Sequence, residues 1–167
     1  MSKVALERLV HVFSSEVVAR HTDHGDETVT VRPDRLVELM HFLRTDSITS
    51  FEMLTDVTAV DYLGKRETRF EVVYHLYSLT KNHRLRVKVP VDEDEAACAV
   101  PSVIGEWKSA YWMEREVFDL YGIRFAGHPD LRRILLYPEF EGHPLRKDYD
   151  IEHRQPRLPP REGRRHL

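Results

Sequence analysis

The feature that most constrains the fold is a short charged and aromatic stretch, YWMEREVFDLYG, at residues 111–122. Ser109 can cap the start of a helix and Gly122 can end it, so the stretch predicts a helix over residues 110–121. At 100° per residue the apolar side chains fall on one arc, which indicates a buried face. They are Tyr111, Met113, Val117, Phe118, Leu120 and Tyr121.

The charged residues of this predicted helix divide between two faces. Arg115, Glu116 and Asp119 fall opposite the apolar arc, where Arg115 and Asp119 are one turn apart and can pair. Glu114 falls inside the apolar arc, so we expect it to be mostly buried. There it needs a guanidinium or a backbone donor, or its pKa must rise. The nearest cations later in the sequence are Arg124, Arg132 and Arg133.

A short motif occurs twice after this helix. GHPDLRR at residues 127–133 recurs in shorter form as GHPLRK at residues 142–147. Proline fixes its own φ and biases the preceding histidine toward extended geometry. The repeat is too short for a duplicated domain, so it predicts two similar docking turns. Each turn is expected to present two adjacent cations to a neighbouring surface.

These segments together resemble one known family. EREVFDLYGI at 114–123, GHPDLRRIL at 127–135 and EGHPLRKDY at 141–149 are similar to the signature of the C subunit, or 30 kDa subunit, of respiratory complex I. That complex is the proton-pumping NADH:quinone oxidoreductase. LTDVTAVDY at 54–62 resembles the family more weakly. The family commonly has proline where this chain has Asp150, which leaves the path of the following tail open.

The resemblance implies an accessory subunit that binds no cofactor itself. NADH, flavin, the iron–sulfur clusters and quinone (such as ubiquinone) would be held by partner subunits. The chain would brace the D subunit, with the B and I subunits close by, in the peripheral arm at the cytoplasmic face of the bacterial inner membrane. Membrane contact would be indirect, and catalysis would belong to the complex. The implied signature and interface residues are Glu114, Arg115, Glu116, Asp119, Gly122, His128, Pro129, Arg132, Arg133, Gly142, His143, Pro144, Arg146 and Lys147.

Composition narrows the remaining possibilities. With 32% charged residues and a net charge of −3, the chain offers no electrostatic support for binding nucleic acid. The single cysteine, Cys98, excludes an internal disulfide and a self-contained iron–sulfur cluster, and is expected to be a dispensable packing residue. No signal peptide or membrane-spanning run is expected. His21 and His24 flank a predicted turn, where a solvated loop is favoured over a metal site.

The hydrophobic pattern predicts an α+β fold. The expected architecture is a single domain over residues 1–136, with helices packed on a mainly antiparallel or mixed sheet. The first predicted elements are a helix at 3–14 and a hairpin of strands 16–22 and 27–32. A second helix is expected to begin at Pro33 and to bury Leu36, Val37, Met40 and Leu43. A strand at 51–62, a hairpin of strands 69–79 and 85–90, and a short helix entered near Pro101 and Ser102 follow.

Residues 137–167 are predicted to form an extended docking tail rich in proline and arginine. Residues 143–167 carry seven cations against four acids, while the rest of the chain is acidic. Four prolines forbid a continuous helix or a central strand there. We expect residues 143–150 to lie near the domain and the remainder to be extended until a partner surface orders it.

Two alternatives remain open from the sequence. The chain can be the equivalent subunit of a related assembly, such as a reduced-deazaflavin dehydrogenase, a plastid-type dehydrogenase or a membrane-bound hydrogenase. It can also be a free-standing enzyme that uses the acid-rich helix for acid–base chemistry.

Overall fold

The computed structural model describes residues 2–93 and 99–156. Cys98 and the end of the predicted tail, residues 157–167, lie outside the described residues. The elements in chain order are α1 (Ser2–Val12), β1 (Val17–His21), the 3-10 turn η1 (Asp23–Gly25), β2 (Thr28–Val31), α2 (Leu36–Thr45), β3 (Met53–Asp61), β4 (Phe70–Ser78), β5 (His83–Val91), β6 (Ala99–Pro101), α3 (Ala110–Tyr121) and β7 (Arg124–Ala126).

The main sheet has five strands in the order β1-β2-β5-β4-β3. β1 pairs with β2, and β4 pairs with β3 and β5, all antiparallel, whereas β2 and β5 run parallel. A separate parallel pair joins β6 to β7. The predicted α+β class, the mixed sheet and both hairpins are therefore confirmed.

The core lies on one face of this sheet. Phe70, Val72, Tyr74 and Leu76 alternate along β4 and are almost fully buried, as their period of two predicts. All three helices add side chains to the same buried cluster, among them Leu9 of α1, Met40 of α2 and Val117 of α3. The three helices therefore cover the core face together.

Three local predictions are wrong. Pro33 belongs to a turn before α2, which begins at Leu36, and Val37 is exposed while Leu39 is buried. The described chain has no helix entered near Pro101 and Ser102, because residues 99–101 form β6, which pairs with β7, and residues 104–106 form a turn. Ser109 makes no capping hydrogen bond, since its hydroxyl donates to the carbonyl oxygen of Leu54 in β3.

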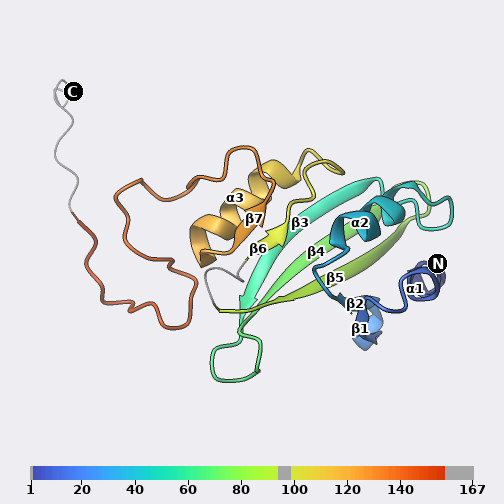
Figure 1. The fold of residues 1–167 in the computed structure, drawn as a ribbon, viewed down its shortest axis with the longest axis horizontal. Helices are drawn as coiled ribbons and strands as arrows, with labels where there is room; N and C mark the ends of the chain where they lie inside the picture. Colours follow the sequence, from blue (N-terminus) through green and yellow to red (C-terminus); the bar gives the residue numbers. More distant parts are fainter. Residues whose placement is uncertain (1, 94–98, 157–167) are drawn as a thin grey trace.

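Residues 127–156, here called the C-terminal segment, follow β7 and lack helices and strands. They run along α3 and then extend beyond it, on the side of the molecule opposite α1 (Figure 1, orange). The predicted bounds of α3 are confirmed.

Candidate functional site

Asp119 of α3 is a fully buried carboxylate that holds the C-terminal segment. Its Oδ2 accepts backbone N–H bonds from Ile134, Leu135 and Leu136 at 3.0, 2.8 and 2.9 Å. Its Oδ1 accepts a bond from the Arg133 guanidinium at 2.8 Å. Burial alone would raise the pKa of Asp119, but these four donors outweigh it and lower the pKa. Asp119 lies opposite the apolar arc, as its position on the helix predicts, and residues 133–136 bury it there.

The predicted pair between Arg115 and Asp119 is also absent from the described residues. Arg115 instead donates to the carbonyl oxygens of Arg132 and Arg133, both at 3.0 Å. Its guanidinium lies 5.3 Å from the ring centroid of Trp112. Because the backbone of residues 132–136 lies along α3, it supplies acceptors to Arg115 and donors to Asp119, and each side chain finds its partner there.

The second Gly-His-Pro turn caps the carboxyl end of α3. His143 donates from Nδ1 to the carbonyl oxygen of Asp119 at 2.8 Å, and the N–H of Leu145 donates to that of Leu120 at 3.1 Å. Arg146 donates to the carbonyl oxygen of Tyr121. These are carbonyl groups that a helix end leaves without partners. The turn is therefore an internal cap as well as part of the family signature.

Gly122 makes this cap possible. It ends α3 in the left-handed conformation with φ 77°, which glycine adopts without strain. A Cβ at this position would lie 2.5 Å from Nη2 of Arg146 and 2.7 Å from the His143 ring. The prediction that Gly122 ends the helix is confirmed, and the close approach adds a second reason for glycine.

The first Gly-His-Pro turn docks at the other end of α3. His128 donates from Nε2 to the carbonyl oxygen of Tyr111 at 3.0 Å, while its Nδ1 accepts the N–H of Asp130 at 3.1 Å. The Tyr111 hydroxyl and Arg132 both donate to the Asp130 carboxylate, at 2.8 and 2.9 Å. Each copy of the motif thus places its histidine on a carbonyl oxygen of the same helix.

Of the four cations in the two Gly-His-Pro turns, two point toward α3 and two are exposed. Arg133 and Arg146 turn inward to α3, and Arg133 also donates to the carbonyl oxygen of Gly142. Arg132 and Lys147 are exposed, as are Glu116, Pro129 and Gly142, while Pro144 is half-buried. The exposed members of the predicted set are the ones best placed to contact a neighbouring surface.

A second buried carboxylate, Asp61 of β3, ties the C-terminal segment to the sheet. It accepts bonds from Arg69 at 3.1 and 2.9 Å and from the N–H of Lys147 at 2.8 Å. Arg69 also pairs with Asp148 at 2.6 Å and with Glu93. The hydrogen bonds from Arg69 to its acidic partners raise the guanidinium pKa further. Sequence reasoning missed this anchor, although Asp61 shares the core-facing period of Val57 and Ala59.

Glu114 is fully buried, as predicted, and its partners are neutral. Oε1 accepts the N–H of Val103 at 2.8 Å and Oε2 accepts the Ser102 hydroxyl at 2.6 Å. Burial raises the pKa of Glu114 to about 7, since two hydrogen bonds offset only part of the desolvation. The backbone donor is confirmed, whereas Arg124, Arg132 and Arg133 do not reach this carboxylate within the described part of the chain.

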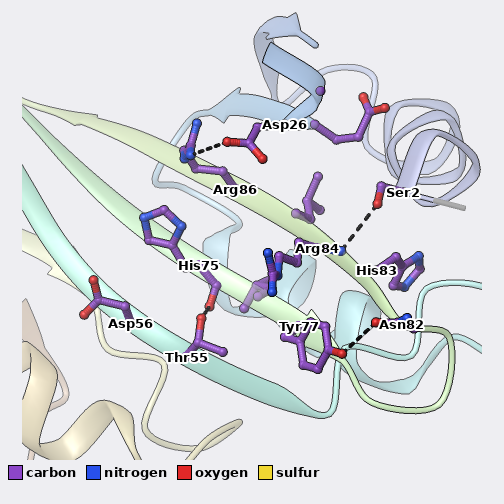
Figure 2. A pocket seen from close by; sticks show the side chains of 14 residues that line it. Ser2, Asp26, Thr55, Asp56, His75, Tyr77, Asn82, His83, Arg84 and Arg86 are labelled. Carbon is purple, nitrogen blue, oxygen red and sulfur yellow. Dashed lines mark hydrogen bonds and ion pairs between the residues drawn. The ribbon is translucent and has the colours of Figure 1, made fainter. Parts of the chain in front are cut away.

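A polar groove lies elsewhere, on the sheet face opposite the core, and Ser2 of α1 lies at its edge. It measures about 770 Å³ and is lined by residues of β3, β4, β5 and the turn before β2. Figure 2 shows its polar side chains linked to one another, with Arg86 on Asp26 at 3.0 Å and the Tyr77 hydroxyl on Asn82 at 2.8 Å. None of the predicted site residues lines this groove.

The described residues contain no group of three or more side chains that could hold a metal ion. At the histidine pair of the first hairpin, His21 lies 3.1 Å from Asp23, and His24 occupies a turn with φ 57°. Among the described helices, none is long and apolar enough to cross a membrane.

Known proteins match the chain over most of its length. The family model described as "Respiratory-chain NADH dehydrogenase, 30 Kd subunit" matches residues 29–155. The C subunit of the NADH-quinone oxidoreductase of Trichlorobacter lovleyi is 51% identical over 148 residues, which is 89% of each chain. The same subunit of Geobacter metallireducens is 49% identical over equal shares.

Two solved structures share the fold. A trypsin-resistant fragment (1–134) of Nqo5 superposes with a TM-score of 0.66 at 34% identity, covering 76% of this chain and 99% of the fragment. A chain of the membrane-bound sulfane sulfur reductase, an archaeal respiratory membrane complex, superposes with a TM-score of 0.75 at 23% identity. The superposition covers 90% of this chain and 86% of that chain. At that identity the second likeness shows the fold alone.

Proposed function

Because the chain belongs to the 30 kDa subunit family of respiratory-chain NADH dehydrogenase and is a subunit of an NADH-quinone oxidoreductase, we propose that it braces the complex through α3 and the C-terminal segment. Its main partner is the D subunit, with the B and I subunits close by. NADH, flavin, the iron–sulfur clusters and quinone are held by those partners and their neighbours. The chain lies peripherally at the cytoplasmic face of the inner membrane.

The observation that carries this proposal is a pair of exposed apolar side chains on a part of the fold whose charged groups already have hydrogen-bond partners. Trp112 of α3 is 58% exposed and Leu135 of the C-terminal segment is 60% exposed. Beside them, Arg115 and Asp119 are buried and saturated by backbone groups of residues 132–136. Tryptophan is enriched among residues that dominate binding at interfaces. A rigid, exposed tryptophan therefore supports docking to another protein.

The acid-rich helix does not favour a free-standing enzyme. Glu114 is fully buried against Ser102 and Val103, and Asp119 already accepts four hydrogen bonds. A general acid or base must come within hydrogen-bond reach of a substrate. Of the three acids on α3, only Glu116 is exposed. The helix therefore supports bracing of the fold better than proton transfer to a substrate.

Related assemblies remain the second candidate, because a chain of this fold also occurs in another respiratory membrane complex. The identity of about half of all aligned residues to the C subunits of NADH-quinone oxidoreductases favours NADH as the electron source of the complex. The bracing role is the same in both cases.

Affinity purification of the tagged full-length chain from its native host tests the proposal. We expect the D, B and I subunits to co-purify, and Trp112→Ala to reduce their recovery by about tenfold or more, as for a hot-spot residue. The matched control is Leu79→Ala at an exposed leucine between β4 and β5. Recovery of none of these subunits with the unaltered chain would overturn the proposal.

A further inference from the structure

Residues 137–156, here called the C-terminal loop, close on themselves instead of being extended. The Tyr137 hydroxyl donates to the carbonyl oxygen of Pro156 at 3.2 Å. The side chain of Gln155 accepts the N–H of Glu141 at 2.8 Å and donates to its carbonyl oxygen at 2.9 Å. The prediction of an extended chain beyond residue 150 is therefore wrong for the described residues up to 156. Local side-chain bonds supply the order that was expected only from a partner.

Aromatic rings fill this loop. Phe140 and Tyr149 stack at 6.2 Å between centroids with 16° between planes, and His153 meets Tyr149 edge-on at 6.1 Å. Tyr137 contacts Phe140 at 5.6 Å. The Tyr149 hydroxyl accepts a bond from Gln155. Such contacts add stabilisation beyond the area that they bury. The loop thus holds a fixed shape in the isolated chain.

The tip of the loop is a tight turn at residues 150–153. The Asp150 carboxylate accepts the N–H of Glu152 at 2.9 Å, and the Asp150 carbonyl oxygen accepts the N–H of His153 at 3.0 Å. An aspartate side chain that bonds the backbone two residues on is a recognised turn former. Ile151 lies within this turn and is 94% exposed. The described chain holds no other large hydrophobic side chain with so high an exposed fraction.

We propose that Ile151 is a preformed anchor that enters an apolar pocket with a basic rim on a neighbouring subunit of the oxidoreductase. This inference rests on the proposed function, because it names one contact within the same assembly. A side chain presented on a rigid turn loses little conformational entropy on binding. The convex shape of the turn fits a concave partner.

The charges beside Ile151 indicate which kind of surface it binds. Asp150 and Glu152 flank it directly and are both exposed, so a partner surface with arginine or lysine side chains complements them. A bilayer is a poorer candidate, because one isoleucine buries too little area to anchor a protein in lipid. A two-fold contact between copies would bring like charges together.

A photo-crosslinking residue placed at position 151 of the full-length chain tests the contact in the assembled complex. We expect a crosslink to a peptide of an identified oxidoreductase subunit that contains both apolar and basic residues. In parallel, Ile151→Asp should lower recovery of the complex by about 10-fold to 100-fold, the range that burial of one isoleucine supplies. Ile151→Leu should retain recovery.

Two controls separate the outcomes. Leu79→Asp introduces the same charge at a distant exposed leucine and should change recovery little. Thermal unfolding of isolated Ile151→Asp should match the unaltered chain, because the side chain is already in solvent. If Ile151→Asp and the unaltered chain recover equal amounts of the complex, the anchor is wrong while the proposed function stands. If the unaltered chain recovers none, the proposed function itself fails.

Three further results would overturn the anchor. These are equal losses for Leu79→Asp and Ile151→Asp, binding to anionic phospholipid vesicles that depends on Ile151, and a concentration-dependent dimer of the isolated chain that Ile151→Asp abolishes.

Discussion

Glu114 and Asp119 lie on the same helix and both are fully buried, but they differ in what surrounds them. Asp119 meets a guanidinium and three backbone N–H groups, which lower its pKa. Glu114 meets one hydroxyl and one N–H, and burial raises its pKa to about 7. Desolvation acts on both carboxylates in the same direction. The difference comes from the segments that cover them, the C-terminal segment over Asp119 and the loop after β6 over Glu114.

The largest expected effect concerns the Asp119 side of this comparison. A chain that ends after Leu136 keeps all four donors to Asp119 but loses the cap that His143, Leu145 and Arg146 place on α3. We expect a folded domain that no longer co-purifies with the complex. Normal assembly of the truncated chain would show that residues beyond 136 do not dock.

Replacing Asp119 with asparagine tests directly whether its negative charge makes it differ from Glu114. The change keeps the shape but leaves Arg133 and the backbone donors without an anion, so we expect a loss of about 3 kcal/mol in the free energy of unfolding. Urea denaturation measures it. The matched control is Glu116→Gln on the exposed face of α3, which should change stability by less than about 0.5 kcal/mol. Equal small losses in both variants would contradict the anchoring role of Asp119.

Gly122→Ala tests the contact between the helix end and the cap. The new methyl group would meet Arg146 and His143, and alanine would be strained at φ 77°. The two effects together should lower the free energy of unfolding by about 2 kcal/mol. Gly64→Ala is the control, because Gly64 has a similar φ of 69° and a Cβ there would meet no atom within 4 Å. In Gly64→Ala only the backbone strain acts. An equal loss of stability in both variants would therefore show that the contacts of the new methyl group with Arg146 and His143 have no effect.

The smallest loss at a single low pH is expected at Glu114, which also makes stability depend on pH. Its folded pKa of about 7 exceeds the ordinary 4.5, so the folded state binds the extra proton between these values. Stability from Glu114 is then present at low pH and falls as pH rises through this window, by roughly 1 kcal/mol per pH unit. For Asp119, whose pKa is lowered, the contribution is lost only below its ordinary 3.8.

Urea denaturation of Glu114→Gln at several pH values measures this effect. The variant should show a flatter profile than the unaltered chain from pH 4.5 to about 7. Glu114→Gln leaves no cation unpaired, so at pH 4.5 the free energy of unfolding should fall by only about 1 kcal/mol. A profile identical to that of the unaltered chain would show that Glu114 does not titrate in this range.

Local patterns were sufficient where neighbours in sequence are also neighbours in space. The bounds of α3 and its left-handed end at Gly122 follow from the helical period and the glycine after it, and the burial of Phe70, Val72, Tyr74 and Leu76 follows from the strand period. The burial of Glu114 follows from the same period, because its direction on α3 lies within the apolar arc. The α+β class follows from the order of such elements, and the family from three short motifs.

Tertiary structure decided the features that depend on contacts between segments far apart in the chain. The helical period places Asp119 opposite the apolar arc of α3, and residues 133–136 fold back and cover it with donors. The short strand β6 exists because β7 pairs with it, and Asp61 becomes an anchor because Lys147 and Asp148 reach the sheet. Buried polar groups must be hydrogen-bonded. The sequence by itself therefore determined burial on the apolar faces, Glu114 included, whereas the return of the chain decided that Arg115 and Asp119 are buried and which groups they pair with.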